Sequence, residues 1–119
     1  RNMKFTGYIH SFEEKFTYLA QSKVFVLPSY EENWAIVIGE AMASSVPVVA
    51  YKLKELVEVW GEHASWVETG NTGEFANVVI NHLANLKQLT RRTQEALDFV
   101  RKLDWKEIAT KELEYIFSV

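Results

Sequence analysis

Two glutamates, Glu32 and Glu40, are the residues of this chain whose type and spacing could do chemistry. They form the pattern Glu-x7-Glu, and Glu40 is the only charged residue in the apolar run 33–42. A carboxylate in such a run is costly to bury unless a partner or a ligand contacts it. Each carboxylate could accept hydrogen bonds from a pair of hydroxyl groups. The alternative is that Glu40 lies on a narrow solvent-facing stripe and Glu32 is an ordinary acidic residue of a first helical turn.

The elements around these glutamates predict where they lie. Residues 24–27 form a continuous apolar run, typical of a strand buried on both faces, and a helix is predicted over residues 35–44. The loop 29–34 would then lie at the carboxyl end of a parallel strand, where open α/β sheets bind ligands. The start of the helix favours a phosphate, and eight helical residues rise about 12 Å. These features predict a site for a nucleotide-sugar.

The rest of the chain alternates between predicted strands and helices. Residues 3–9, 48–51 and 64–67 are predicted strands, and residues 55–60 and 86–101 are predicted helices. Capping boxes at Ser11 with Glu14 and at Asn71 with Glu74 open two more helices. The second of these helices would carry its apolar face on Ala76, Val79, Ile80 and Leu83, and a final helix would begin near Asp104 and Glu107.

This alternation predicts an α/β fold with right-handed βαβ crossovers. We expect a three-layer Rossmann-like parallel sheet of about four strands, followed by a helical C-terminal tail. Residues 1–119 would form one partial domain, divided into 1–84 and the C-terminal helices 85–119.

Composition excludes several classes of protein. The chain has 119 residues, 48% of them apolar, and a formal charge of −3. This mild acidity argues against a nucleic-acid binder, and no apolar run predicts a transmembrane helix. The absence of cysteine fits a reducing compartment, so a cytoplasmic location is expected.

Residues 24–50 resemble the donor-binding signature of retaining GT-B glycosyltransferases, most closely the family called glycosyl transferases group 1. The resemblance rests on Pro28-Ser29, the Glu32-x7-Glu40 pair, Glu40-Ala41-Met42-Ala43 and Pro47-Val48-Val49, in that order. Weaker similarity covers Phe5-Thr6-Gly7-Tyr8 and, near the end of the chain, Asp104-Trp105 with Tyr115.

The resemblance implies a role for each site residue. Glu32, Asn33, Trp34 and Ala35 would contact the donor sugar, while Ile36 and Glu40 would bind the nucleotide, with Glu40 on the ribose. Backbone amides of residues 33–36 would face the sugar and diphosphate, and no side chain is assigned as catalytic. The leaving phosphate would help deprotonate the acceptor, and the anomeric configuration would be retained.

The resemblance also implies that no metal or other cofactor is needed, because the helix dipole and basic residues neutralise the diphosphate. Lys52 and Lys54 could contact phosphate, or they could be ordinary solvated lysines. The acceptor would be a glycan or a lipid-linked molecule, so peripheral membrane contact is one expectation.

The chain departs from the family pattern at three positions. Asn33, Ala35 and Ser45 stand where the family usually has glycine, and the Ala35 methyl group is expected near the path of the donor. The acceptor-binding domain and the first strands of the donor domain are also missing, so the isolated chain is expected to be inactive. A non-catalytic interaction module with a degenerate fold is the alternative function, and the exposed sheet edge predicts a homodimer.

Other conspicuous residues have simpler interpretations. The histidines His10, His63 and His82 have no metal-ligand spacing and are expected at the surface or in loops. Trp34 could stack on the donor or pack beneath the loop, and the expected core anchors are Trp60, Trp66 and Trp105. A basic group could touch anionic lipid or form a solvated helix face: Arg91, Arg92, Arg101 and Lys102.

Overall fold

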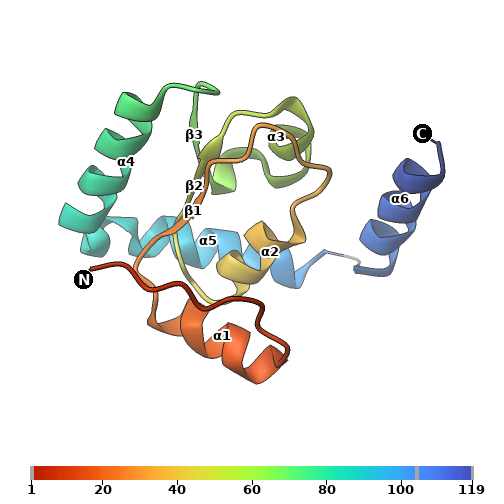
Figure 1. Cartoon of the computed structure of the whole chain (residues 1–119), viewed down its shortest axis with the longest axis horizontal. Coiled ribbons are helices and arrows are strands. Elements are labelled where there is room, and N and C mark those ends of the chain that lie inside the picture. Colours follow the sequence, from red (N-terminus) through yellow and green to blue (C-terminus); the bar gives the residue numbers. More distant parts are fainter. Residues whose placement is uncertain (1, 104, 119) are drawn as a thin grey trace.

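A parallel sheet with strand order β1-β2-β3 forms the centre of the computed structural model, which describes residues 2–103 and 105–118 (Figure 1). The strands are β1 (Phe25–Leu27), β2 (Val48–Tyr51) and β3 (Ser65–Val67). The α-helices are α1 (Phe12–Gln21), α2 (Ile36–Ala43), α3 (Lys54–Trp60), α4 (Thr72–Ala84), α5 (Thr90–Arg101) and α6 (Trp105–Ser118). Short 3-10 turns, η1 (Gly61–His63) and η2 (Leu86–Leu89), precede β3 and α5. The predicted α/β class with a Rossmann-like parallel sheet is confirmed.

Side chains of β2 alternate between two apolar clusters, one on each face of the sheet. Val48 and Ala50 pack with residues of α2, α3 and α5, whereas Val49 and Tyr51 pack against Phe75 of α4. Because all four β2 residues are buried, helices cover both faces of this central strand. Figure 1 shows the same arrangement, with α4 on one side of the sheet and α2 on the other. The predicted three layers are confirmed.

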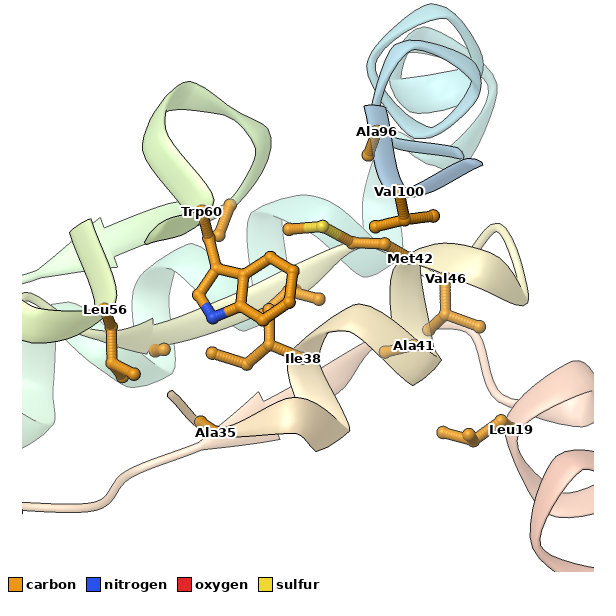
Figure 2. Close-up of a cluster of buried hydrophobic side chains, with 13 residues drawn as sticks. Leu19, Ala35, Ile38, Ala41, Met42, Val46, Leu56, Trp60, Ala96 and Val100 are labelled. Carbon is orange, nitrogen blue, oxygen red and sulfur yellow. The ribbon is translucent and has the colours of Figure 1, made fainter. Parts of the chain in front are cut away.

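The larger cluster forms around α2 (Figure 2). Ile38, Ala41 and Met42 are fully buried and share one face of this helix by their i, i+3, i+4 spacing. Trp60 and Leu56 of α3 close the cluster from the other side. This packing confirms Trp60 as a core anchor and fixes α2 against the sheet.

The predicted strand at residues 3–9 is wrong, and so is the expectation of about four strands. The segment before α1 has no strand conformation, and Gly7 within it has φ +67°. A left-handed residue interrupts an extended run. Met3, Phe5 and Tyr8 are exposed, as expected for a segment that does not pack on the sheet.

β1 is therefore one of the two edge strands of the described sheet, and its expected burial on both faces is wrong for Val26. Val26 is opposite Val49 in the parallel register, yet its side chain is 43% exposed. α4 contacts β2 and β3 and leaves the same face of β1 open.

Both predicted capping boxes open the expected helices. Ser11 Oγ accepts from the Glu14 amide at 3.3 Å, and Asn71 Oδ1 accepts from the Glu74 amide at 3.0 Å. The predicted apolar face of α4 is wrong in part, because the inward residues are Phe75, Val78, Val79 and His82, while Ala76, Ile80 and Leu83 are exposed.

The final helix, α6, is present and stands at the opposite end of the molecule from α4 (Figure 1). The proposed cap at Asp104 lies outside the described residues, as do the side chains of Trp105 and Tyr115. Trp66 of β3 is half-buried and packs at the margin of the larger cluster, where its Nε1 donates to the Gly61 carbonyl at 2.7 Å.

Candidate functional site

The loop after β1 lines an open hollow of about 550 Å³ at the carboxyl end of the strand. Its lining consists of Tyr30, Glu31, Glu32 and Asn33 from the loop and Glu55 from α3. Two of the predicted site residues, Glu32 and Asn33, are thus brought together here. This location is the ligand-binding edge of an open parallel sheet.

Charge in the hollow favours hydroxyl groups over phosphate. The lining contains Glu31, Glu32 and Glu55, and no lysine or arginine is among its described residues. Carboxylates accept hydrogen bonds from hydroxyls, whereas they repel an anionic phosphate. The hollow is therefore chemically suited to a sugar.

An aromatic contact holds the start of the loop. The ring of Tyr30 lies 5.4 Å from that of Tyr51, and the ring of Tyr51 lies 5.1 Å from that of Phe75, both in edge-to-face geometry. Burial, with Tyr30 beside it, raises the pKa of Tyr51 above its ordinary value. The Tyr51 hydroxyl therefore stays neutral, and the loop is anchored to the end of β2.

A hydrogen bond from the core holds the end of the loop. Trp60 Nε1 donates to the Trp34 carbonyl at 2.6 Å, and the Trp60 side chain is fully buried. The Trp34 side chain is half-buried. The loop is thus fixed at both ends before it enters α2.

Ala35 makes the turn from this loop into α2 in a left-handed conformation, with φ 49° and ψ 64°. This is a conformation that glycine adopts without strain. The Ala35 side chain is buried in the larger cluster, near Leu56 and Trp60 (Figure 2). The Ala35 methyl group therefore packs in the core, and its expected place near the donor path stays a prediction.

Ser45 is the second non-glycine residue with positive φ among the described residues, at 59°. The Ser45 amide donates to the Met42 carbonyl and the Val46 amide to the Ala41 carbonyl, both at 3.0 Å. These two bonds form a Schellman motif, which usually has glycine at this position. Asn33 does not share the left-handed conformation, so two of the three glycine-like positions keep the backbone that glycine favours.

Glu40 is paired with a lysine from the neighbouring helix. Lys15 Nζ of α1 lies 2.8 Å from Glu40 Oε2, and the Glu40 side chain is 18% exposed. This pairing accounts for the charge in the apolar helix, so Glu40 is not on a freely solvated stripe. Glu40 is absent from the lining of the hollow, so the structure places the two glutamates in different surroundings.

The two candidate phosphate-binding lysines lie outside the hollow. Lys52 and Lys54 are both exposed, and neither lines the hollow. The Ile36 side chain is partly exposed at the first residue of α2. The backbone start of α2 is thus the feature next to the loop that is suited to an anion.

His82 is buried, contrary to the expected surface or loop position. Its side chain is 7% exposed, and Nε2 lies 2.9 Å from Ser65 Oγ. Burial and the Arg92 guanidinium lower the pKa of His82. Arg92 Nη1 also donates to Ser65 Oγ at 3.1 Å. This cluster lies at the amino end of β3, away from the strand-end loop.

Arg91, His63 and His10 have local contacts, whereas Arg101 and Lys102 are exposed. Arg91 Nε lies 3.7 Å from Glu95 Oε1 across one turn of α5, which fits a solvated helix face. His63 stacks on Phe99 at 4.4 Å between ring centroids, and His10 is exposed beside Tyr8.

Comparison with known proteins identifies the family of the chain. A family profile described as glycosyl transferases group 1 matches residues 1–85. The chain belongs to this family. The matched part of this group 1 chain includes the strand-end loop, α2 and all of α4.

A curated relative supports the same assignment. O-antigen chain mannosyltransferase B of Escherichia coli is 23% identical to the group 1 chain over 111 residues, which cover 93% of this chain and 29% of the relative. The chain thus spans less than a third of that relative's length. Within the described residues, no helix combines the length and apolar character needed to cross a membrane.

Proposed function

We propose that this chain is the donor-binding part of a retaining GT-B glycosyltransferase, which transfers a sugar from a nucleotide-sugar to a glycan or lipid-linked acceptor. The observation that carries the proposal is the carboxylate-lined hollow at the carboxyl end of β1, next to the start of α2. Membership of the group 1 family supports glycosyl transfer in general. The relative's name suggests mannose as the first sugar to test.

In this proposal Glu32 accepts hydrogen bonds from hydroxyls of the donor sugar. Asn33 lines the hollow beside Glu32, and Trp34 follows it in the same loop. The backbone from Ala35 to Ile36, at the start of α2, faces the diphosphate. The sugar and the diphosphate bind at different places because of charge. The anionic hollow suits the sugar hydroxyls, and the positive start of α2 suits the diphosphate. Glu40, one turn further along α2, would accept from the ribose.

The chain's residues would bind and orient the donor rather than react with it. In a retaining transfer, the bond from the anomeric carbon to the diphosphate oxygen breaks, and the bond to the acceptor oxygen forms on the same face. The acceptor proton would pass to the departing phosphate oxygen. No glutamate of this chain needs to act as a nucleophile. Lys52 or Lys54 would contact the phosphate only if its side chain moved toward the hollow.

A binding experiment tests the proposal. UDP-, GDP- and ADP-linked sugars, with mannose donors first, are titrated calorimetrically into the longest natural protein that contains residues 1–119. Wild type should bind one of these donors, and Glu40→Gln should weaken that binding by about tenfold or more, since a hydrogen bond to a charged group is worth about 1.5–3 kcal/mol. Glu32→Gln should weaken binding of the nucleotide-sugar more than binding of the free nucleoside diphosphate.

Glu58→Gln is the matched control, because Glu58 is an exposed glutamate on α3 outside the hollow. It should leave donor affinity unchanged. If Glu40→Gln binds donors as wild type does, the ribose assignment is wrong.

The alternative is a non-catalytic interaction module. The Lys15–Glu40 pair favours it in one respect, because it gives Glu40 a structural reason to be present without any ligand. Absence of binding to every nucleotide-sugar at millimolar concentration would support this alternative and contradict the donor-binding proposal.

A further inference from the structure

Lys15 is the ion-pair partner of Glu40, and neither the predicted site nor the family signature gives it a role. It lies on the apolar stripe of α1, three residues after Phe12 and four before Leu19. A lysine on this stripe extends toward α2 instead of toward open solvent, and its side chain is only 34% exposed. Lys15 and Glu40 are thus two opposite charges, each placed on a largely apolar helix face.

Aromatic rings hold the Lys15 ammonium group in place. Nζ lies 4.9 Å from the centroid of the Phe12 ring and 5.8 Å from that of Phe16. Both distances are within the range in which a cation is attracted to the face of a ring. Together with the Glu40 carboxylate at 2.8 Å, the rings leave the ammonium in a defined position.

The pair retains capacity for hydrogen bonds. Lys15 Nζ has three N–H donors, and Glu40 Oε2 is its one hydrogen-bond partner in the described structure. Glu40 Oε1 makes no hydrogen bond within the described residues. One donor group and one acceptor group therefore stand side by side with unused bonds.

A hydroxyl group matches such a pair better than it matches a carboxylate alone. A hydroxyl both donates and accepts, whereas a carboxylate can only accept and an ammonium can only donate. Two adjacent ribose hydroxyls could thus donate to Glu40 Oε1 and accept from Lys15 Nζ together.

We propose that Lys15 is a second nucleotide-binding residue, which orients Glu40 through their ion pair and donates a hydrogen bond to a ribose hydroxyl. This inference rests on the proposed donor-binding function and adds a residue to it. The exposed Phe12 ring, 73% accessible beside Lys15, would form one border of the ribose position.

The test pairs a change in the protein with a change in the ligand. UDP, GDP and ADP and their 2′-deoxy and 3′-deoxy counterparts are titrated into the longest natural protein that contains this chain, as wild type and as Lys15→Met. Wild type should prefer a ribonucleotide over at least one deoxy counterpart by about tenfold. In Lys15→Met that preference should fall to within about threefold, because the hydroxyl has lost its donor.

Two further variants separate binding from a purely structural role. Lys15→Arg keeps the positive charge beside Glu40 and should restore part of the preference for ribose. Lys23→Met removes an exposed lysine that lies between α1 and β1, and it should bind as wild type does. Circular dichroism of Lys15→Met should show the wild-type helical spectrum at the temperature of the titration, which separates a loss of ribose preference from a loss of folding.

The outcomes distinguish this inference from the function on which it rests. An unchanged ribose preference in Lys15→Met, or an equal loss of affinity for ribo- and deoxynucleotides, would overturn the role of Lys15 while leaving the donor site intact. Failure of wild type to bind any of the nucleotides would overturn both.

Discussion

Two residues in the left-handed conformation, Ala35 and Ser45, show how single positions shape the site. Both stand where the group 1 pattern led us to expect glycine, and both keep positive φ. The backbone geometry is therefore retained at a cost in strain of about 1–2 kcal/mol at each residue. At Ala35 the buried methyl group offsets part of that cost.

The buried methyl group of Ala35 and the exposed side chain of Ser45 lead to different predictions for replacement by glycine. Ser45→Gly should raise the free energy of unfolding by about 1 kcal/mol, since it removes strain at an exposed turn and no buried group. Ala35→Gly should be nearly neutral, because loss of a buried methyl costs about 0.8 kcal/mol. Urea denaturation measures both changes.

Ser44→Gly is the control for this comparison. Ser44 has φ −95°, and its hydroxyl donates to the Glu40 carbonyl at 3.0 Å, so glycine there should destabilise the protein. If Ser44→Gly raised the free energy of unfolding as much as Ser45→Gly, backbone strain at residue 45 would not be the cause of the stabilisation.

The sequence could predict that Glu40 needs a partner but not which partner. The cost of a charge in an apolar helix follows from the local pattern, whereas Lys15 is 25 residues away and depends on how α1 packs against α2. One signal was present: Lys15 interrupts the apolar stripe of α1, as Glu40 interrupts α2. Two isolated opposite charges on neighbouring apolar helices indicate a pair.

At the scale of elements, α4 shows where periodicity fails. The apolar residues of α4 could form either of two adjacent apolar faces. The structure buries the face that contains Phe75, Val78 and His82. Contact with β2 and β3 decides between the faces, and the helix sequence alone does not contain that contact. His82 was consequently expected at the surface, although it packs against Ser65 of β3.

The burial of His82 predicts a dependence of stability on pH. Its folded-state pKa is lowered, so its contribution is fully present above the unfolded value of 6.5 and is lost as pH falls through the folded value. Unfolding free energy should therefore be lower at about pH 5 than at about pH 7.5. Urea titrations at both values measure the difference.

His82→Leu should reduce this pH dependence, even if the variant is less stable at neutral pH. His10→Gln is the control, since His10 is exposed, and it should keep the wild-type dependence. Equal pH profiles for wild type and His82→Leu would show that His82 is not the source of the effect.

At the scale of the whole molecule, the sheet has an open edge at β1. The alternation of strands and helices correctly predicted β1, β2 and β3 and their covering helices, because buried apolar runs and capping boxes are local signals. It overpredicted residues 3–9, where strand formation depends on a neighbour that would bury Met3 and Phe5. The boundary between a half-domain 1–84 and helices 85–119 stays a prediction.

The open edge predicts self-association of the 119-residue chain. β1 pairs with β2 alone in the described sheet, and Val26 on this edge is 43% exposed. Unpaired strand edges are templates for pairing with another chain. Sedimentation velocity should show an increasing fraction of dimer as protein concentration rises.

Val26→Lys should shift this equilibrium toward monomer, because charged side chains protect edge strands. Ile80→Lys, on the exposed face of α4, should leave it unchanged. A wild-type chain that stays monomeric at every concentration would contradict pairing through this edge.

The carboxylate-lined hollow affects the rate at which an anionic nucleotide-sugar associates with the chain. Glu31, Glu32 and Glu55 form a negative surface at its mouth, and the chain itself carries a formal charge of −3. The negative surface would repel an anionic donor as it approaches. Dissolved salt shortens the range of this repulsion to about 8 Å at physiological ionic strength. The association rate of a nucleotide-sugar would then rise with ionic strength, opposite to the usual behaviour of electrostatically steered ligands.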